Sequence, residues 1–328
     1  MSTTIRFKCL ACEADYPADR GTFICPDCGA NLEVQYAFGA LDRDRISART
    51  RHDIFRYHEW LPVDFPEHVP SLRIGGTPLY RAQRLGEQVG FHRVYLKDEG
   101  LNPSGSFKDR ATAVVVSRAL ADKVEVVAAA STGNAGSSLA CLGANCGIRT
   151  VVCVPENAPE AKMTQLQIFG AEILAVRGTY DDAYDLCARL CREHGWLNRN
   201  TGFNPFTREG KKTAAFELCE QFDWDPPEWV VVPVGDGNII SGLWKGFVEM
   251  KAVGFIDRLP RLVCAQAEGS AAIVQALEGL GPDFSGDWTT VKVAPFAADT
   301  VADSVSVDDP RDGLAAVRAV IESDGLAE

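Results

Sequence analysis

The sequence predicts an α/β fold in which mostly parallel sheets are covered by helices on both faces, a three-layer αβα arrangement, with a small cysteine-rich module at the N-terminus. Three observations predict it. Short apolar strands alternate with helical stretches between residues 93 and 267, glycine-rich loops follow three of the strands, and two Cys-x-x-Cys pairs stand near the start of the chain. Strand–helix alternation produces parallel sheets because each crossover helix packs on a sheet face.

The predicted strands are short apolar runs at residues 93–99, 125–131, 150–156, 172–178, 229–235 and 261–267. The predicted helices lie between and beside them, at residues 107–121, 134–147, 158–170, 179–195, 209–222 and 240–254. Several of these helices begin next to a Ser, Thr, Asn or Pro that suits a helix start. No repeat of fixed period and no low-complexity stretch interrupts the alternation.

Composition excludes several classes of protein. A chain of 328 residues is long enough for two domains with a small appendage. The net charge of -12 argues against a partner such as nucleic acid or an anionic membrane, because there is no basic excess to displace counterions. No apolar run approaches the roughly 18 residues of a membrane span, and the first residues lack the apolar core of a secretory signal. We therefore expect a cytoplasmic protein.

Four cysteines near the N-terminus have the spacing of a zinc site. Cys9 and Cys12 form one Cys-x-x-Cys pair, and Cys25 and Cys28 form a second pair after twelve intervening residues. Each pair folds into a knuckle that presents two thiolates, and two knuckles complete a tetrahedral shell. Four cysteines leave no open position, so the predicted Zn2+ is structural. The alternative is four unrelated thiols.

Seven further cysteines lie on apolar faces and are interpreted as buried structural thiols. They are Cys141, Cys146, Cys153, Cys187, Cys191, Cys219 and Cys264. Cys187 and Cys191 are four residues apart on one predicted helix face and could share a metal, although no other ligand is near them in the sequence.

The first glycine-containing loop ends in a lysine. Gly100, Pro103 and Gly105 force an irregular turn, after which Ser106-Phe107-Lys108 opens a helix. The positive end of the helix dipole disfavours an ammonium group and helps to lower its pKa. Such a lysine suits Schiff-base chemistry, whereas most lysines in this chain are expected to be solvated surface charges.

Two further loops each join a strand to a helix start. In residues 131–138, the side chains of Ser131, Thr132 and Asn134 add donors suited to a carboxylate, next to free amides. In residues 233–242, the amides from Gly235 to Ile239 could cradle a phosphate. This loop lacks the spacing of a dinucleotide fingerprint or a P-loop. Taken singly, either loop could equally be an ordinary tight turn.

Together the three loops resemble the fold-type-II, tryptophan synthase β-like family of pyridoxal-phosphate (PLP) enzymes, the group that holds threonine synthase, serine and threonine dehydratases and cysteine synthase. EGLNPSGSFKDR is similar to the lysine motif of the threonine synthase-like members, STGNAG to the loop that binds the substrate carboxylate, and PVGDGNIISG to the phosphate cup. An N-terminal zinc ribbon also occurs in threonine synthase-like proteins. NPFTREGKKTAAFEL and TVADSVSVDDPRD have counterparts as well.

The resemblance implies a role for each loop. Lys108 would form the Schiff base with PLP and then move protons, and Asn134 would reach the 3′-oxygen of the cofactor. The implied cofactor phosphate site consists of Gly235, Asp236, Gly237, Asn238 and Ile239. The implied substrate site consists of Ser131, Thr132, Gly133, Asn134, Ala135 and Asn204. Zinc would take no part in the chemistry.

The family also implies a division of the chain. Residues 1–38 would form the zinc ribbon and residues 39–75 a connector. Residues 76–110 and 200–328 would form a large PLP-binding domain, and residues 111–199 a small domain that binds the substrate carboxylate.

The implied activity is that of a threonine synthase-like lyase, which converts O-phosphohomoserine and water to threonine and phosphate. One alternative is another β-replacing or β-eliminating enzyme that acts on O-phosphoserine, serine or threonine, such as a cysteate synthase-like enzyme or a dehydratase. Another is a truncated, non-catalytic or subunit-like homologue. The expected partners are a small amino-acid substrate, a second copy in a homodimer, and for the last alternative a completing partner chain.

The first departure from the family pattern bears on the substrate. Thr179 stands where many threonine synthases have an asparagine that helps to bind the substrate phosphate, and no arginine follows until Arg189. Thr207 stands where they often have arginine, although Arg208 is adjacent. We therefore expect either that a phosphorylated substrate is rejected or that it is held in a different way.

The second departure concerns the end of the sequence. Beyond IESDGLAE the family normally continues to a Ser or Thr loop that hydrogen-bonds the pyridine nitrogen of PLP, and this sequence contains no such segment. We expect that the sequence is a fragment, that it is a short form completed by another chain, or that it is a degenerate member of the family. Each predicts an exposed sheet edge and exposed apolar surface.

Overall fold

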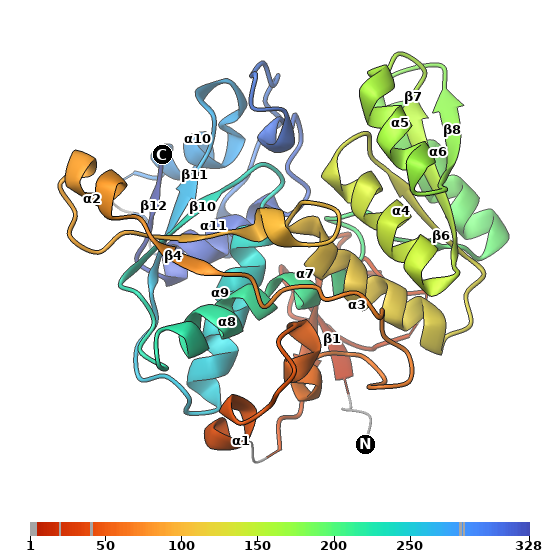
Figure 1. The fold of residues 1–328 in the computed structure, drawn as a ribbon. Coiled ribbons are helices and arrows are strands. Elements are labelled where there is room, and N and C mark those ends of the chain that lie inside the picture. The colour runs from red at the N-terminus through yellow and green to blue at the C-terminus, as the bar shows by residue number, and fades with distance from the viewer. Residues whose placement is uncertain (1–4, 20, 40–41, 282–283, 285) are drawn as a thin grey trace.

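The computed structural model describes residues 5–19, 21–39, 42–281, 284 and 286–328. Residues 1–4 of the predicted ribbon and residues 40–41 of the predicted connector therefore lie outside the described residues. Figure 1 shows two sheet-containing halves, with helix α3 (Lys108–Ala121) between them and the N-terminal strands packed below.

One half contains a four-stranded parallel sheet in the order β8-β7-β6-β9. Its strands are β6 (Val126–Ala130), β7 (Arg149–Pro155), β8 (Glu172–Val176) and β9 (Leu197–Asn198). Helix α6 (Tyr180–His194) packs against Val126, Ala128 and Ala130. Helices α4 (Asn134–Cys146) and α5 (Glu160–Ile168) cover the other face. Strand β6 is apolar at every position because both of its faces are buried.

The other half contains a three-stranded parallel sheet in the order β10-β11-β12. Its strands are β10 (Trp229–Pro233), β11 (Arg261–Ala265) and β12 (Leu326–Ala327). Helices α8 (Thr213–Gln221), α9 (Asn238–Ala252) and α11 (Gly313–Glu322) pack with this sheet in one hydrophobic core. Val231, on the edge strand β10 of this sheet, is 67% exposed.

Strands β4 (Leu79–Arg81) and β5 (Tyr95–Lys97) form a separate antiparallel pair. The remaining helices are α1 (Arg43–Ser47), α2 (Gln83–Val89) and α10 (Ala272–Glu278). Short 3-10 turns lie at Ile54–Trp60, Glu99–Leu101, Glu268–Ser270, Trp288–Thr290 and Asp303–Val305. A search of the described helices finds none with the length and apolar character needed to cross a membrane.

Helix α3 packs closely against helix α7 (Phe206–Lys211). A Cβ atom at Gly210 would lie 1.8 Å from the backbone oxygen of Arg110, so only glycine permits this approach. The contact fixes the start of α3, which carries Lys108, against the segment that ends at Lys211.

All six predicted helices and all six predicted strands are present, with two differences of note. The helix predicted at 209–222 is divided at Lys212, since α7 ends at Lys211 and α8 begins at Thr213. Helix α9 begins at Asn238, two residues before the predicted start, because Gly237 with φ +96° makes the turn that precedes it.

The N-terminal strands form an antiparallel sheet in the order β2-β1-β3, from β1 (Ile5–Cys9), β2 (Asp15–Pro17) and β3 (Leu32–Tyr36). Phe7 on β1 and Phe23 in the segment between β2 and β3 pack against Phe206, with ring centroids 5.6 and 6.1 Å away. The side-chain amide of Asn31 donates to the backbone oxygen of Gly202 at 2.7 Å. The sheet is thus part of the packed structure and not a tethered appendage.

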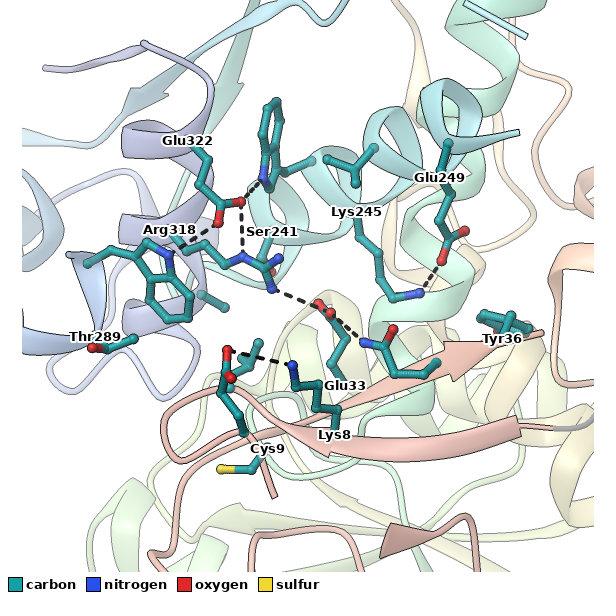
Figure 2. Close-up of a pocket in the computed structure, with 18 of the residues that line it drawn as sticks. Lys8, Cys9, Glu33, Tyr36, Ser241, Lys245, Glu249, Thr289, Arg318 and Glu322 are labelled. Atoms are coloured by element: carbon teal, nitrogen blue, oxygen red, sulfur yellow. Dashed lines mark hydrogen bonds and ion pairs between the residues drawn. The ribbon is translucent and has the colours of Figure 1, made fainter. Parts of the chain in front are cut away.

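A cavity of about 530 Å³ separates this sheet from helices α9 and α11, and charged side chains line it (Figure 2). Each of the three cations at its wall has an anionic partner. Lys8 pairs with Glu13, Lys245 with Glu209 and Glu249, and Arg318 with Glu33 and Glu322. These pairs neutralise the wall of the cavity, and the pair of Arg318 with Glu33 joins helix α11 to strand β3 of the N-terminal sheet.

Candidate functional site

A second cavity, of about 540 Å³, lies beyond the carboxyl ends of β6 and β10. It is lined by Lys108, by residues 131–135 after β6, by residues 235–239 after β10, and by residues 303–309. The carboxyl ends of parallel strands are where α/β folds bind ligands. The fold therefore brings the three predicted loops to one place, although more than 100 residues separate the first loop from the last.

Of the predicted cofactor and substrate residues, all except Asn204 line this cavity. Asn204 is 2% exposed, and both ends of its side chain are used locally. Its amide donates to the backbone oxygen of Asn198 at 2.8 Å, and its oxygen accepts from the backbone N–H of Phe206 at 3.0 Å. The predicted substrate residue Asn204 therefore closes the turn before α7 and does not reach the cavity.

Lys108 is the first residue of α3, and its amine has no hydrogen-bond or ion-pair partner in the part of the chain that the structure describes. Burial lowers the pKa of Lys108, the charge of Arg199 lowers it further, and Asp236 partly opposes both. An amine in this environment is neutral in a larger fraction of molecules and is a better nucleophile and base.

Arg110, two residues after Lys108, anchors the start of α3 from within the protein. Its guanidinium is fully buried and donates to both carboxylate oxygens of Glu99, at 2.7 Å each, and of Glu217, at 2.7 and 2.8 Å. The amine of Lys97 also reaches Glu217, at 2.6 Å. Burial alone would raise the pKa of Glu217, but Arg110 and Lys97 lower it to about 2. Arg110 therefore ties the lysine loop to helix α8.

The loop after β10 has a shape that only glycine permits. Gly237 has φ +96°, and a Cβ atom there would lie 2.6 Å from the backbone oxygen of Asp312. Asp312 also accepts from the side chains of Asn238 and Arg208, at 2.5 Å each. The first backbone N–H groups of α9 have no partner inside the helix and point out of its N-terminus. The loop therefore offers a rigid cradle of N–H donors to an anion such as phosphate.

Asp236 stands in the same loop. Burial and the nearby Asp312 raise the pKa of Asp236 to about 7, and Lys211 opposes them. One carboxylate oxygen accepts the backbone N–H of Arg311 at 2.8 Å, and the other has no hydrogen-bond partner among the described residues. At such a pKa roughly half of the molecules are protonated near pH 7, so the free oxygen can donate to an anion.

Tyr180, Arg199 and Lys211 are among the side chains that line the cavity without having been predicted from the sequence. Arg199 follows the short strand β9, and Lys211 is the last residue of α7. The one sequence signal for Lys211 was the pair of adjacent lysines within a predicted amphipathic helix. No local pattern indicates that Arg199 lies inside the protein.

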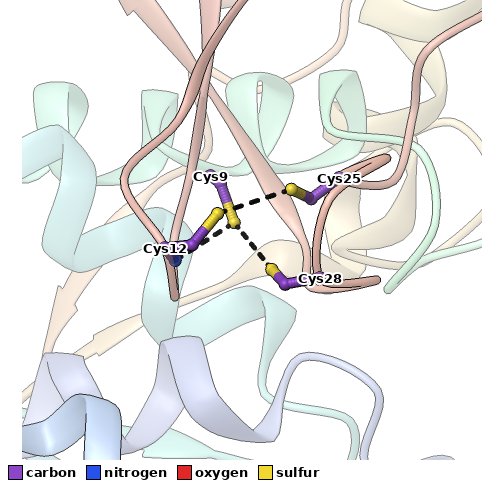
Figure 3. A group of neighbouring side chains, drawn as sticks. All are labelled: Cys9, Cys12, Cys25 and Cys28. Atoms are coloured by element: carbon purple, nitrogen blue, oxygen red, sulfur yellow. Dashed lines mark hydrogen bonds between the residues drawn. The ribbon is translucent and has the colours of Figure 1, made fainter.

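The four N-terminal cysteines lie together, as Figure 3 shows. Their sulfur atoms are all within 4.8 Å of one another, with Cys9 and Cys28 3.5 Å apart and Cys12 and Cys25 3.6 Å apart. Zinc–sulfur bonds of about 2.3 Å in a tetrahedron place sulfur atoms roughly 3.8 Å apart, so this arrangement fits a zinc ion.

The seven other cysteines were predicted to be buried. Six of them are buried, and Cys146 is partly exposed near the end of helix α4. Cys187 packs against Cys153 and Cys191 in the core between α6 and its sheet. Among the described residues the one group of metal-ligating side chains found is the N-terminal cluster, so Cys187 and Cys191 do not form a second site.

Comparison with known proteins places the chain in a family. Residues 70–327 match the family profile described as "Pyridoxal-phosphate dependent enzyme". The chain is 38% identical over 327 residues to threonine synthase of Methanocaldococcus jannaschii, covering 98% of this chain and 78% of that protein. It is 37% identical over 323 residues to threonine synthase of Methanosarcina acetivorans, covering 98% of this chain and 77% of that protein.

Among solved structures, the chain resembles the processed form of threonine deaminase isoform 2 from Solanum lycopersicum, with a TM-score of 0.63 and 21% identity, over 77% of this chain and 64% of that one. Maize serine racemase gives a TM-score of 0.61 at 21% identity, over 77% of this chain and 72% of that one. These likenesses show the fold-type-II architecture alone. With the profile match and the threonine synthase relatives, they show that the chain belongs to the family of PLP-dependent enzymes.

Proposed function

We propose that the protein is a threonine synthase-like lyase that converts O-phosphohomoserine and water to threonine and phosphate, with PLP held by Lys108. The observation that carries the proposal is the meeting of the partner-free Lys108 amine with both anion-binding loops in one cavity. The two relatives that align over 98% of this chain are both named threonine synthase, which supports the choice among PLP-dependent reactions.

The residues of the cavity fit the cofactor. PLP carries an aldehyde and a phosphate, which match a buried amine with a lowered pKa and a cradle of N–H donors that a Cβ atom would fill. When bound, PLP supplies an electron sink for negative charge at the substrate α-carbon. Lys108 would hold the cofactor and Gly235–Ile239 would hold its phosphate.

The protein's own groups would then orient the substrate and move protons. Ser131, Thr132 and the N-terminus of α4 would bind the substrate carboxylate and so fix the position of the α-carbon. The amine of Lys108, whose pKa is lowered, would take the proton from that carbon and return it later.

The test is to supply the purified, PLP-loaded protein with O-phosphohomoserine and to measure threonine and inorganic phosphate together. We expect the two products in equal amounts. O-phosphoserine, serine and threonine are supplied in parallel, with phosphate and keto-acid release followed separately. The proposal is wrong if O-phosphohomoserine never yields threonine.

A β-replacing or β-eliminating enzyme that acts on O-phosphoserine, serine or threonine is the second candidate, and two threonines favour its unphosphorylated substrates, serine and threonine. The Thr179 side chain is used to cap α6, where it accepts from Asp182, and Thr207 donates to the backbone oxygen of Asn204 at 2.8 Å. Neither lines the cavity. At both places where threonine synthases often hold the substrate phosphate, this chain therefore offers no contact. The third candidate, a non-catalytic or subunit-like homologue, predicts a protein that stays colourless when PLP is added.

We further propose that the four cysteines hold a structural zinc ion, and that a Cys25→Ser change releases it. A serine hydroxyl is a much weaker ligand than a thiolate, and metal binding in such knuckles stabilises the fold. We expect the variant to lose close to one zinc per chain, measured by elemental analysis, and to unfold at lower urea. Cys146→Ser, outside the cluster, is the matched control and is expected to keep its metal. Equal zinc in Cys25→Ser and the parent protein would contradict the proposal.

The homodimer and the cytoplasmic location remain predictions from the sequence and the family resemblance.

A further inference from the structure

We infer that Arg199 and Lys211 form an anion-binding subsite beside Lys108, which selects amino acids that carry a second negative group, such as a phosphate ester, at the end of the side chain. The inference rests on the proposed function, because it takes the substrate to be an amino acid that reacts next to Lys108. It adds the residues that would recognise the substrate phosphate in this chain.

Arg199 is buried, and part of its guanidinium group has no partner. It is 1% exposed, and its Nε atom donates to the hydroxyl of Thr112 at 3.2 Å. One terminal nitrogen is buried with no hydrogen-bond partner within the described residues. No carboxylate there forms an ion pair with it. The nearby Asp109, whose charge partly offsets the effect of burial on the pKa of Arg199, accepts hydrogen bonds from Ser104 instead. A buried guanidinium in this state gains free energy from an incoming anion.

Lys211 differs from the lysine that follows it. The Lys212 amine pairs with Glu209 at 2.6 Å and with Glu249 at 2.8 Å, whereas Lys211, 2% exposed, lines the cavity and has no ion-pair partner in the described chain. Two carboxyl groups face Lys211. Asp312 already accepts from Arg208 and Asn238, and Asp236 has a raised pKa and is only partly ionised. Lys211 is therefore not neutralised by either.

The cavity contains more basic side chains than the cofactor and the substrate carboxylate would pair with. Lys108 would be occupied by the cofactor, Gly235–Ile239 by its phosphate, and the loop at 131–135 by the substrate carboxylate. Arg199 and Lys211 would still face the cavity, and the charge of Arg199 lowers the pKa of both Lys108 and Lys211 by repulsion. A substrate with a neutral side chain would leave the Arg199 guanidinium buried and unmatched. The Lys211 amine, whose pKa is lowered well below its usual value by burial and by the charges of Lys108 and Arg199, would also stay without a partner. A phosphate ester would pair with both groups and favour protonation of Lys211.

The acidic residues at the mouth of the cavity do not change this balance. They are exposed, and two of them have partners of their own: Asp303 pairs with Lys162 at 2.7 Å, and Asp181 lies 3.8 Å from Arg311. Asp308 and Asp309 are also exposed. The buried positive charge replaces the contacts that are missing at Thr179 and Thr207.

The experiment measures binding to the PLP-loaded protein, in which the cradle at 235–239 is filled by the cofactor. Matched amino acids with and without phosphate, O-phosphohomoserine and homoserine, are titrated against the visible absorption of the cofactor, and inorganic phosphate is tested as a competitor. Arg199→Gln and Lys211→Gln are each expected to weaken binding of O-phosphohomoserine and of phosphate by about 10- to 100-fold. Binding of homoserine is expected to change by less than about threefold.

Charge-preserving and surface variants complete the design. Arg199→Lys and Lys211→Arg are expected to keep most of the preference for phosphate, which a purely structural role would not predict. Arg149→Gln and Lys251→Gln, at exposed positions, are expected to bind as the parent protein does. Loss of cofactor absorption in Arg199→Gln or Lys211→Gln would overturn the inference, because it would assign those side chains to PLP instead.

The inference is also overturned if the glutamine variants lose affinity for homoserine and O-phosphohomoserine equally, or if inorganic phosphate competes equally well in them. Its failure differs from failure of the proposed function. If threonine is formed and the variants keep their preference for phosphate, the subsite is contradicted and the proposed reaction is not. Strong, Arg199-dependent binding of O-phosphohomoserine without any threonine supports the subsite and contradicts the proposed reaction.

Discussion

Replacing Lys108 with alanine is expected to give a folded protein that has no visible cofactor band and almost no activity. Lys108 is the one lysine at the meeting point of both loops that also opens helix α3, and its amine has no competing partner in the described chain. Losing both the cofactor attachment and the proton-moving group should reduce turnover by at least about 100- to 10,000-fold. Absorbance after addition of PLP and an assay with O-phosphohomoserine measure the two effects.

Borohydride reduction followed by peptide mass analysis identifies the lysine to which PLP is attached. We expect the parent protein to carry the reduced cofactor on the peptide containing Lys108. Peptides containing two other lysines are analysed for comparison. Lys211 is buried and lines the same cavity, whereas Lys251 is exposed. A labelled peptide containing Lys211, or a yellow Lys108→Ala protein, would show that the attachment site was wrongly assigned.

Replacing Arg110 with methionine is expected to destabilise the protein more than any of the other substitutions. The change keeps most of the side-chain volume but leaves Glu99 and Glu217 buried without their shared guanidinium. Removing one partner of a buried ion pair costs about 3–5 kcal/mol, because the remaining charge stays desolvated. Urea unfolding followed by tryptophan fluorescence measures the loss, and the start of α3 should become less protected from hydrogen exchange.

The pH dependence distinguishes this electrostatic effect from poor packing. In the parent protein the pKa of Glu217 is about 2, below its usual value, so its contribution to stability is present above about pH 4.5 and is lost as the pH falls toward 2. Without Arg110, only Lys97 still opposes the effect of burial, so the pKa of Glu217 rises and its contribution to stability at neutral pH is lost. The destabilisation should therefore be smaller at pH 4 than at pH 7. A loss of equal size at both values would point to packing.

Arg149→Met is the control for this prediction. Arg149 pairs with Glu172 at 2.7 Å, but both side chains are about half exposed. Water replaces the lost partner at such a position, so we expect the unfolding midpoint to stay unchanged.

The sequence was informative wherever the signal is local. Strand β6 was predictable because its run of valine and alanine is buried on both faces, and α6 because its start carries a threonine cap. The loops at 131–138 and 233–242 were predictable because glycines and small polar residues stand between a strand and a helix start, and a Cβ atom would clash at Gly136 and at Gly237. These features depend on residues only a few positions apart.

What the sequence did not predict depends on contacts between distant segments. Arg110 meets Glu217 across 107 positions, and Arg199 meets Thr112 across 87. Whether Lys211 or Lys212 faces the cavity depends on the break between α7 and α8 and on the carboxylates that already hold Lys212. Asn204, by contrast, lies outside the cavity because its donor and its acceptor are both used in its own turn.

The docking of the N-terminal sheet has a consequence for the order of events during synthesis. Its partners come late: Asn31 bonds Gly202, Tyr36 bonds Glu209, and Glu33 pairs with Arg318, at separations of 171, 173 and 285 residues. At about 5–20 residues per second, a ribosome needs roughly 10–35 s to reach the first two partners. Until Phe206 has been synthesised, the rings of Phe7 and Phe23 cannot pack against it. A chaperone that binds nascent chains is therefore expected to find this sheet first, and to be displaced when α7 emerges.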